Sequence, residues 1–314
     1  MAIAAVLPAA AFALSGVRLR GVLAVLKLQP PRGGLDLLAL ASLATAVGLL
    51  GLAAAQPALA RTVQQQERTD VQVLFVVDIS GSMAAAATPE SPTRLDRAIV
   101  DAEKLRAAIP NVEAGVATLT DRVLPSLLPV PDLPAFDATL ERSLGIEAPP
   151  PETSAVTATS YTALAQLSTG NYFTAPNRVA VVLTDGESAT FSAADVARAL
   201  ARAPGVSLIT VRVWGADESI YLRGGRIDPG YRPDPQGAAT LRELADATGG
   251  STFDESQLGR AAAALRQRVG SGPTERTTAV ERSAVPIAPY VALVALVPLA
   301  VLALRRVRRF RAKA

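Results

Sequence analysis

Two apolar runs in this sequence each end in an aspartate, and this pairing constrains the fold more than any other feature. Val71–Val77 is rich in β-branched residues and is followed by Asp78, and Arg178–Thr184 is followed by Asp185. Short apolar runs of this kind are typical of buried strands in a parallel sheet. Ligands of a doubly wound sheet bind beyond the carboxyl ends of its strands. Both aspartates are therefore expected at the same edge of one sheet.

Segments with helical patterns alternate with further apolar runs along residues 71–269. Helices are expected over Thr93–Ala108, Ser192–Ala201, Gly237–Thr248 and Gln257–Val269, and strands over Val112–Leu119, Val206–Trp214 and Ser251–Phe253. Pro125–Pro151 is expected to be a loop with a short helix near Ala135–Leu144, and Asp217–Pro235 a surface excursion with Asp217 and Glu218 in solvent. The alternation predicts the α/β class, as a doubly wound, mostly parallel, Rossmann-like sheet flanked by helices.

The residues after the two aspartates suit a hard cation. In Asp78-Ile79-Ser80-Gly81-Ser82 the alternation can aim three side chains to one side of a tight loop, and Gly81 relieves the turn. Two carboxylates and several neutral hydroxyl oxygens match the ligands of Mg²⁺, with Mn²⁺ or Ca²⁺ as alternatives. The competing interpretation is a strand-to-helix turn capped by Asp and Ser. The second motif, Thr184-Asp185-Gly186-Glu187, favours the cation.

Composition excludes most catalytic chemistry. The chain has no Cys and no His, which excludes disulfides, thiol nucleophiles, Ser-His-Asp triads and His zinc sites. A Mg²⁺-dependent hydrolase remains chemically possible. However, phosphatases of the haloacid-dehalogenase type have an Asp where this chain has Ser80. We therefore expect a binding centre and no enzyme.

The motifs resemble those of a known family. Val73–Met83, an apolar strand followed by DISGSM, is similar to the opening of a von Willebrand factor A (VWA) domain with a metal-ion-dependent adhesion site. Val181–Ser188, VVLTDGES, is similar to the family's second metal motif, and the resemblance covers about residues 70–268. It implies that Ser80 and Ser82 bind the metal through their hydroxyls, and that Asp78 and Asp185 act directly or through water.

The family's third element is a Thr in the loop between these motifs. The segment here reads Thr157-Ala158-Thr159-Ser160-Tyr161-Thr162, without the usual Gly-Gly. The resemblance favours Thr159 as the third hydroxyl ligand, because a helix can continue from Tyr161. Thr157 and Thr162 remain alternatives.

Three uncharged stretches predict membrane segments. Residues 37–57 and 284–304 are long enough to span a bilayer, and residues 1–17 are a shorter third span or a signal peptide. The intervening parts are expected to be a cytoplasmic loop (18–36), a linker (58–70), the VWA domain (71–269), a tether (270–283) and a basic tail (305–314). This arrangement resembles that of the bacterial Bat-type, aerotolerance-associated membrane proteins.

Charge predicts the orientation of this chain in the membrane. Residues 61–283 carry a net charge of −6, whereas four Lys and Arg precede residue 37 and six follow residue 304. Basic residues beside spans mark the cytoplasmic side, so the VWA domain is expected outside the cytoplasm of a multi-pass protein. The basic tail is too short and too poor in aromatics to indicate nucleic-acid binding.

These features together predict a membrane-anchored module that binds a protein partner through a metal. The partner would supply an Asp or Glu carboxylate as the last ligand. A scaffold that assists a AAA+ ATPase is an alternative, although the expected orientation opposes direct contact with a cytoplasmic ATPase.

Overall fold

The computed structural model describes residues 37–56, 58–152 and 159–311. The chain forms two compact units, residues 64–279 and the two ends of the chain. The expected span at residues 1–17 and the candidate ligand Thr157 lie outside the described residues.

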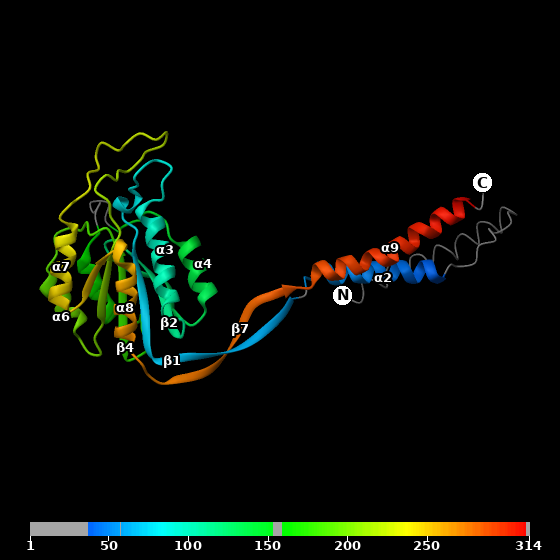
Figure 1. The fold of residues 1–314 in the computed structure, drawn as a ribbon, viewed down its shortest axis with the longest axis horizontal. Helices are drawn as coiled ribbons and strands as arrows, with labels where there is room; N and C mark the ends of the chain where they lie inside the picture. Colours follow the sequence, from blue (N-terminus) through cyan, green and yellow to red (C-terminus); the bar gives the residue numbers. More distant parts are fainter. Residues whose placement is uncertain (1–36, 57, 153–158, 312–314) are drawn as a thin grey trace. The chain divides into compact units, whose positions relative to one another are not determined.

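A seven-stranded sheet forms the centre of the larger unit (Figure 1). Six strands follow the order β3-β2-β1-β4-β5-β6, and β7 (Thr274–Pro286) pairs with β1. The six are β1 (Ala58–Asp78), β2 (Val112–Leu119), β3 (Val123–Val130), β4 (Asn177–Thr184), β5 (Ser207–Arg212) and β6 (Ser251–Asp254). Neighbours along this path are parallel except for the antiparallel β2–β3 pair. The mostly parallel sheet predicted from the sequence is thus confirmed.

Strand order brings the two aspartate motifs together. The order of the strands in the sheet reverses direction at β1, because β2 lies on one side of β1 and β4 on the other. In the β1–β4 register Val77 faces Leu183, so both strands end at the same edge. A ligand site is expected at such a switch point, and Asp78 and Asp185 lie there.

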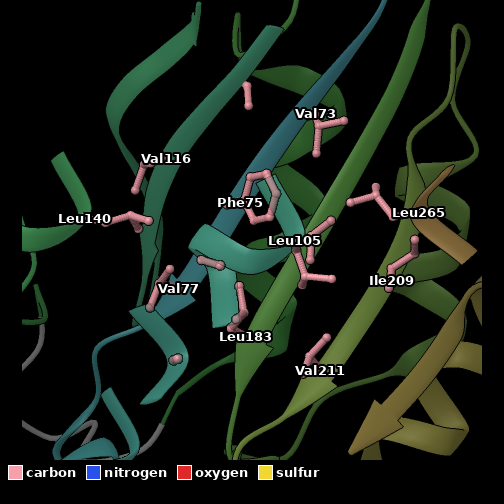
Figure 2. Packing of buried hydrophobic residues seen from close by; sticks show 14 of the residues in the cluster. Val73, Phe75, Val77, Leu105, Val116, Leu140, Leu183, Ile209, Val211 and Leu265 are labelled. Carbon is pink, nitrogen blue, oxygen red and sulfur yellow. The ribbon is translucent and has the colours of Figure 1, made fainter. Parts of the chain in front are cut away.

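Helices cover both faces of the sheet. On one face α3 (Arg94–Ala107), α4 (Leu133–Ser143) and α8 (Leu258–Val269) pack against side chains such as Phe75, Val77 and Val116 (Figure 2). On the other face η2 (Tyr161–Ala165), α5 (Gln166–Thr169), α6 (Ala193–Leu200) and α7 (Gly237–Thr248) pack against Leu74 and Val76. Successive side chains of β1 therefore point alternately into two separate cores, because this strand is buried on both faces. Two further short 3-10 helices are η1 (Gly81–Ala84) and η3 (Glu255–Gln257).

Some elements differ from the sequence prediction. The Pro-rich segment predicted as a loop contains β3, an edge strand that tolerates Pro125 and Pro129 because one side of an edge strand needs no backbone donors. The expected linker 58–70 forms the first part of β1, and most of the tether 270–283 forms β7. The helix expected from Tyr161 begins as the 3-10 helix η2 and ends after the single turn of α5.

Two apolar helices lie in the described part of the smaller unit, together with the beginning of β1 and the end of β7. α2 (Leu37–Ala54) and α9 (Ala288–Arg311) lie side by side, and Ala46 and Ala295 are buried in their unit. Small residues of this kind allow helices to approach closely. Within the described residues only Ala288–Arg305 of α9 is long and apolar enough to cross a membrane, and Leu38–Ala54 is a shorter apolar helix.

Candidate metal centre

Asp78 is the fully buried centre of the site, at the carboxyl end of β1. Its Oδ1 accepts the backbone N–H of Ser80 at 3.0 Å and the hydroxyl of Thr159 at 2.6 Å. Its Oδ2 accepts the hydroxyl of Thr184 at 2.6 Å. Ser80 and Ser82 have their Oγ atoms 3.0 Å apart. The carboxylate is thus held by short bonds, and two further hydroxyls stand beside it.

Thr159 reaches the site by crossing from a separate loop. It is fully buried and forms a parallel bridge with Ser188, whose neighbour Ala189 donates its N–H to the Thr159 carbonyl at 2.8 Å. Because its hydroxyl donates to Asp78, its oxygen lone pairs stay free to bind a cation. Thr162 is exposed on η2 and makes no such contact. Of the two described candidates, Thr159 is the one at the site.

Asp185 follows β4 and is also fully buried. Its Oδ1 accepts the Glu187 N–H at 2.8 Å, and Ser82 donates to its carboxylate. Gly186 has a φ of +91°, and a Cβ there would lie 2.7 Å from the carbonyl oxygen of Gly237. Glycine is thus required where this loop passes the start of α7.

A buried arginine joins the second carboxylate to two more. Arg94, the first residue of α3, is fully buried, and its Nη1 bonds Asp185 at 2.9 Å and Glu187 at 3.0 Å. Its Nε bonds Glu218 at 2.7 Å, and Nη1 also contacts the Tyr231 hydroxyl at 2.7 Å. The remaining nitrogen, Nη2, is buried with no hydrogen-bond partner among the described residues. Glu218, expected in solvent, is therefore a buried ion-pair partner, since its charge is needed to balance Arg94.

Burial sets the charge state of the site. Burial raises the pKa of Asp78, although the hydroxyls of Thr159 and Thr184 lower it. Burial and the neighbouring carboxylates of Asp78 and Glu187 raise the pKa of Asp185 to about 7, against the opposing effect of Arg94. Two carboxylates that resist ionisation in the absence of a cation become good ligands once a cation offsets their charge.

The structure brings all five predicted ligands together. Asp78, Ser80, Ser82, Thr159 and Asp185 form one connected set of oxygen atoms at the β1–β4 edge. Among the described residues no three His, Cys, Asp or Glu side chains gather as a metal-binding group. The candidate centre thus depends on hydroxyls as much as on carboxylates. This donor set fits a small hard cation that keeps part of its water shell.

Sequence reasoning missed the residues that support this set. Thr184 is part of the second motif but was not expected to bond Asp78; the Tyr161 hydroxyl, 2.9 Å away, in turn donates to Thr184. Arg94 and Tyr231 belong to neither motif. A polar side chain at the end of a buried apolar strand, as Thr184 is, could have been suspected. No comparable sequence signal marks Tyr161, Arg94 or Tyr231.

The larger unit has the VWA fold. Among solved structures, BatB from Bacteroides thetaiotaomicron is 21% identical, with a TM-score of 0.52 over 64% of this chain and 100% of the solved chain. An aerotolerance-related membrane protein from Bacteroides fragilis is 24% identical, with a TM-score of 0.50 over 63% of this chain and 98% of that one. No protein-family model and no curated protein sequence matches the chain.

Proposed function

We propose that this chain is a membrane-anchored VWA protein that binds a divalent cation, Mg²⁺ first of all, and through it a carboxylate of a partner protein. The observation that carries the proposal is the junction of two motifs, 107 residues apart, in one connected set of oxygens around Asp78. When bound, the cation would supply a Lewis-acidic position for an anionic ligand.

Each residue of the set has a role in this proposal. The hydroxyls of Ser80, Ser82 and Thr159 offer neutral oxygens, and they can donate their protons to the two carboxylates. Asp78 orients the hydroxyl of Thr159, and Asp185 orients that of Ser82. Because three of the five ligands are neutral, a bound cation would stay open to the carboxylate of a partner's Asp or Glu.

A binding role is favoured over catalysis. With neither His nor Cys in the chain, no imidazole or thiolate can act as general base or nucleophile. Two acids near the set, Glu187 and Glu218, are held by Arg94 and Arg97. The membrane anchor is supported by α9, and an aerotolerance-related membrane protein shares the fold.

Calorimetric titration of the full-length protein in detergent with Mg²⁺ and with Mn²⁺ tests the proposal. Asp78→Asn preserves the shape of the side chain, and Thr159→Val preserves its size. Both should weaken binding, the first by more than the roughly 10–100-fold that loss of an outer-sphere partner costs. Thr162→Val, on an exposed residue of the neighbouring helix, is the matched control and should bind as the wild type does. Equal affinity of wild type and Asp78→Asn would refute the metal centre.

A further inference from the structure

Arg94 is placed where its charge acts on the candidate centre. Its guanidinium is fully buried, and its Nη1 lies 2.9 Å from the Oδ2 of Asp185, one of the five proposed ligands. The pair is shielded from water, so the two charges act on each other far more strongly than a surface pair would. A cation bound at Asp78 and Asp185 would therefore share Asp185 with a permanent positive charge.

The other ligands do not need Arg94 for their orientation. Asp78 is held by Ser80, Thr159 and Thr184, none of which contacts Arg94 through its side chain. Asp185 retains the N–H of Glu187 on its Oδ1 without the guanidinium. Apart from its bond to Asp185 and a long 3.5 Å contact of its Nη1 with the Ser82 carbonyl oxygen, the contribution of Arg94 to the five ligands is hence its charge.

The neighbouring acids do not cancel that charge alone. Glu218, bonded by Arg94, has a second cation in Arg97, whose Nη2 lies 2.6 Å from its Oε1. Glu187 also accepts the Tyr231 hydroxyl at 2.8 Å and the N–H of Asp234 at 3.1 Å. Because Arg97 also pairs with Glu255 and the other donors to Glu187 are neutral, Arg94 divides its charge among three acids, of which Asp185 is the only proposed ligand.

We infer that Arg94 is a built-in counter-charge that weakens the hold of the centre on its metal and strengthens the hold of the metal on a partner's carboxylate. This inference rests on the proposed function. Two buried carboxylates alone would neutralise a divalent cation. Because Arg94 offsets part of the charge of Asp185, a bound cation would keep more positive charge toward an anionic ligand than it would without Arg94.

The test uses full-length protein in detergent, Mn²⁺ as the metal and acetate as the carboxylate. Calorimetry gives the Mn²⁺ affinity, and water-proton relaxation shows whether acetate displaces Mn²⁺-bound water. Arg94→Met removes the charge and keeps the length of the side chain; it should bind Mn²⁺ roughly tenfold more tightly or better, and acetate should displace less water. Arg94→Lys keeps the charge and should resemble the wild type in both measurements.

Two more variants keep the test decisive. Arg198→Met removes an exposed cation of α6 that pairs with Asp195 and touches neither Asp185 nor Glu218, and should change neither affinity. If Arg94→Met does not fold, the double variant with Glu218→Gln removes an acid that would be left short of partners, and should give the same two changes. Weaker Mn²⁺ binding in both Arg94→Met and Arg94→Lys would mean that Arg94 is only a structural support, and would overturn the inference alone. A wild type that binds no Mn²⁺ would overturn the proposed function as well.

Discussion

At the scale of single residues, the centre is a set of hydroxyls that hold one buried carboxylate. Asp78 accepts three hydrogen bonds, and the two from Thr159 and Thr184 are short. A buried carboxylate needs such donors, because each lone pair left unsatisfied away from water is costly. The same donors fix the direction in which the carboxylate presents its remaining lone pairs.

Thr184 provides a test of this outer support. Thr184→Val keeps the shape of the side chain but removes the donor to Asp78, so Mn²⁺ affinity should fall by roughly 10–100-fold and stability by about 1–3 kcal/mol. Thr210→Val is the matched control, because Thr210 is equally buried on the adjacent strand β5 and its hydroxyl has no partner among the described residues. Calorimetry and thermal denaturation should separate the two variants; equal effects would contradict the assigned role.

Asp185 predicts the pH dependence. Burial raises its pKa to about 7 in the metal-free protein, whereas its ordinary value is 3.8. The folded state thus holds a proton that the unfolded state releases, so the contribution of Asp185 to metal-free stability rises as pH falls from about 7 to about 4. A proton competes with the metal in the same range, and Mn²⁺ affinity should fall by up to about tenfold per pH unit below 7.

Titration of Mn²⁺ binding between pH 5 and 8, with Asp185→Asn alongside, checks this dependence. The variant has no carboxyl to titrate at this position, so its weaker binding should depend less on pH. A wild-type affinity that stays constant over the range would contradict the raised pKa of Asp185.

At the scale of elements, the site depends on loops that pass each other closely. The loop after β4 turns at Gly186, where both a positive φ and the backbone of Gly237 exclude a side chain. The start of α7 is thereby fixed against the loop that contains Asp185 and Gly186. Thr93 begins α3 with a capping box to Asp96, and this fixes the position of Arg94.

Gly186→Ala should damage both stability and the site. The left-handed backbone alone costs an alanine about 1–2 kcal/mol, and the contact with the Gly237 backbone adds to this because neither atom can rotate away. Gly249→Ala, at a φ of +62° with open space around it, isolates the conformational cost. Chemical denaturation should therefore find Gly186→Ala clearly less stable than Gly249→Ala, and only the former should lose Mn²⁺ affinity. Equal losses of stability would refute the close approach.

Most of the sheet could be predicted from the sequence, because each parallel strand is a local apolar run with its own boundary. Asp78, Ser80, Ser82 and Asp185 could be placed at one edge because they follow such runs. The strand β3 could not be predicted, because Pro125 and Pro129 indicate a loop unless the strand is known to be at an edge. Arg94 and Glu218 pair although they are 124 residues apart in the sequence. The hydrophobic periodicity of a sequence predicts local elements and gives no information on such distant contacts.

At the scale of the whole molecule, the distribution of charge predicts that the metal centre lies outside the cytoplasm. The basic residues beyond residue 304 and the acidic 61–283 segment predict opposite sides of the membrane. Because the chain has no Cys, single cysteines can report each side without a background.

Labelling of intact bacterial spheroplasts with a membrane-impermeant maleimide tests this orientation. Asp217→Cys, an exposed position in the larger unit, should be labelled before lysis, and Lys313→Cys only after lysis. The reverse pattern would place the domain in the cytoplasm and revive a role beside a cytoplasmic ATPase.

The central claim is that Asp78, Ser80, Ser82, Thr159 and Asp185 together hold a divalent cation. Crystals grown with Mn²⁺, with data collected at a wavelength where manganese scatters anomalously, test it most directly. We predict a single strong anomalous peak bonded to the hydroxyl oxygens of Ser80 and Ser82, which is lost in Asp78→Asn crystals. Absence of that peak in a wild-type crystal soaked at saturating Mn²⁺, or a peak among Glu187 and Glu218 instead, would contradict the account.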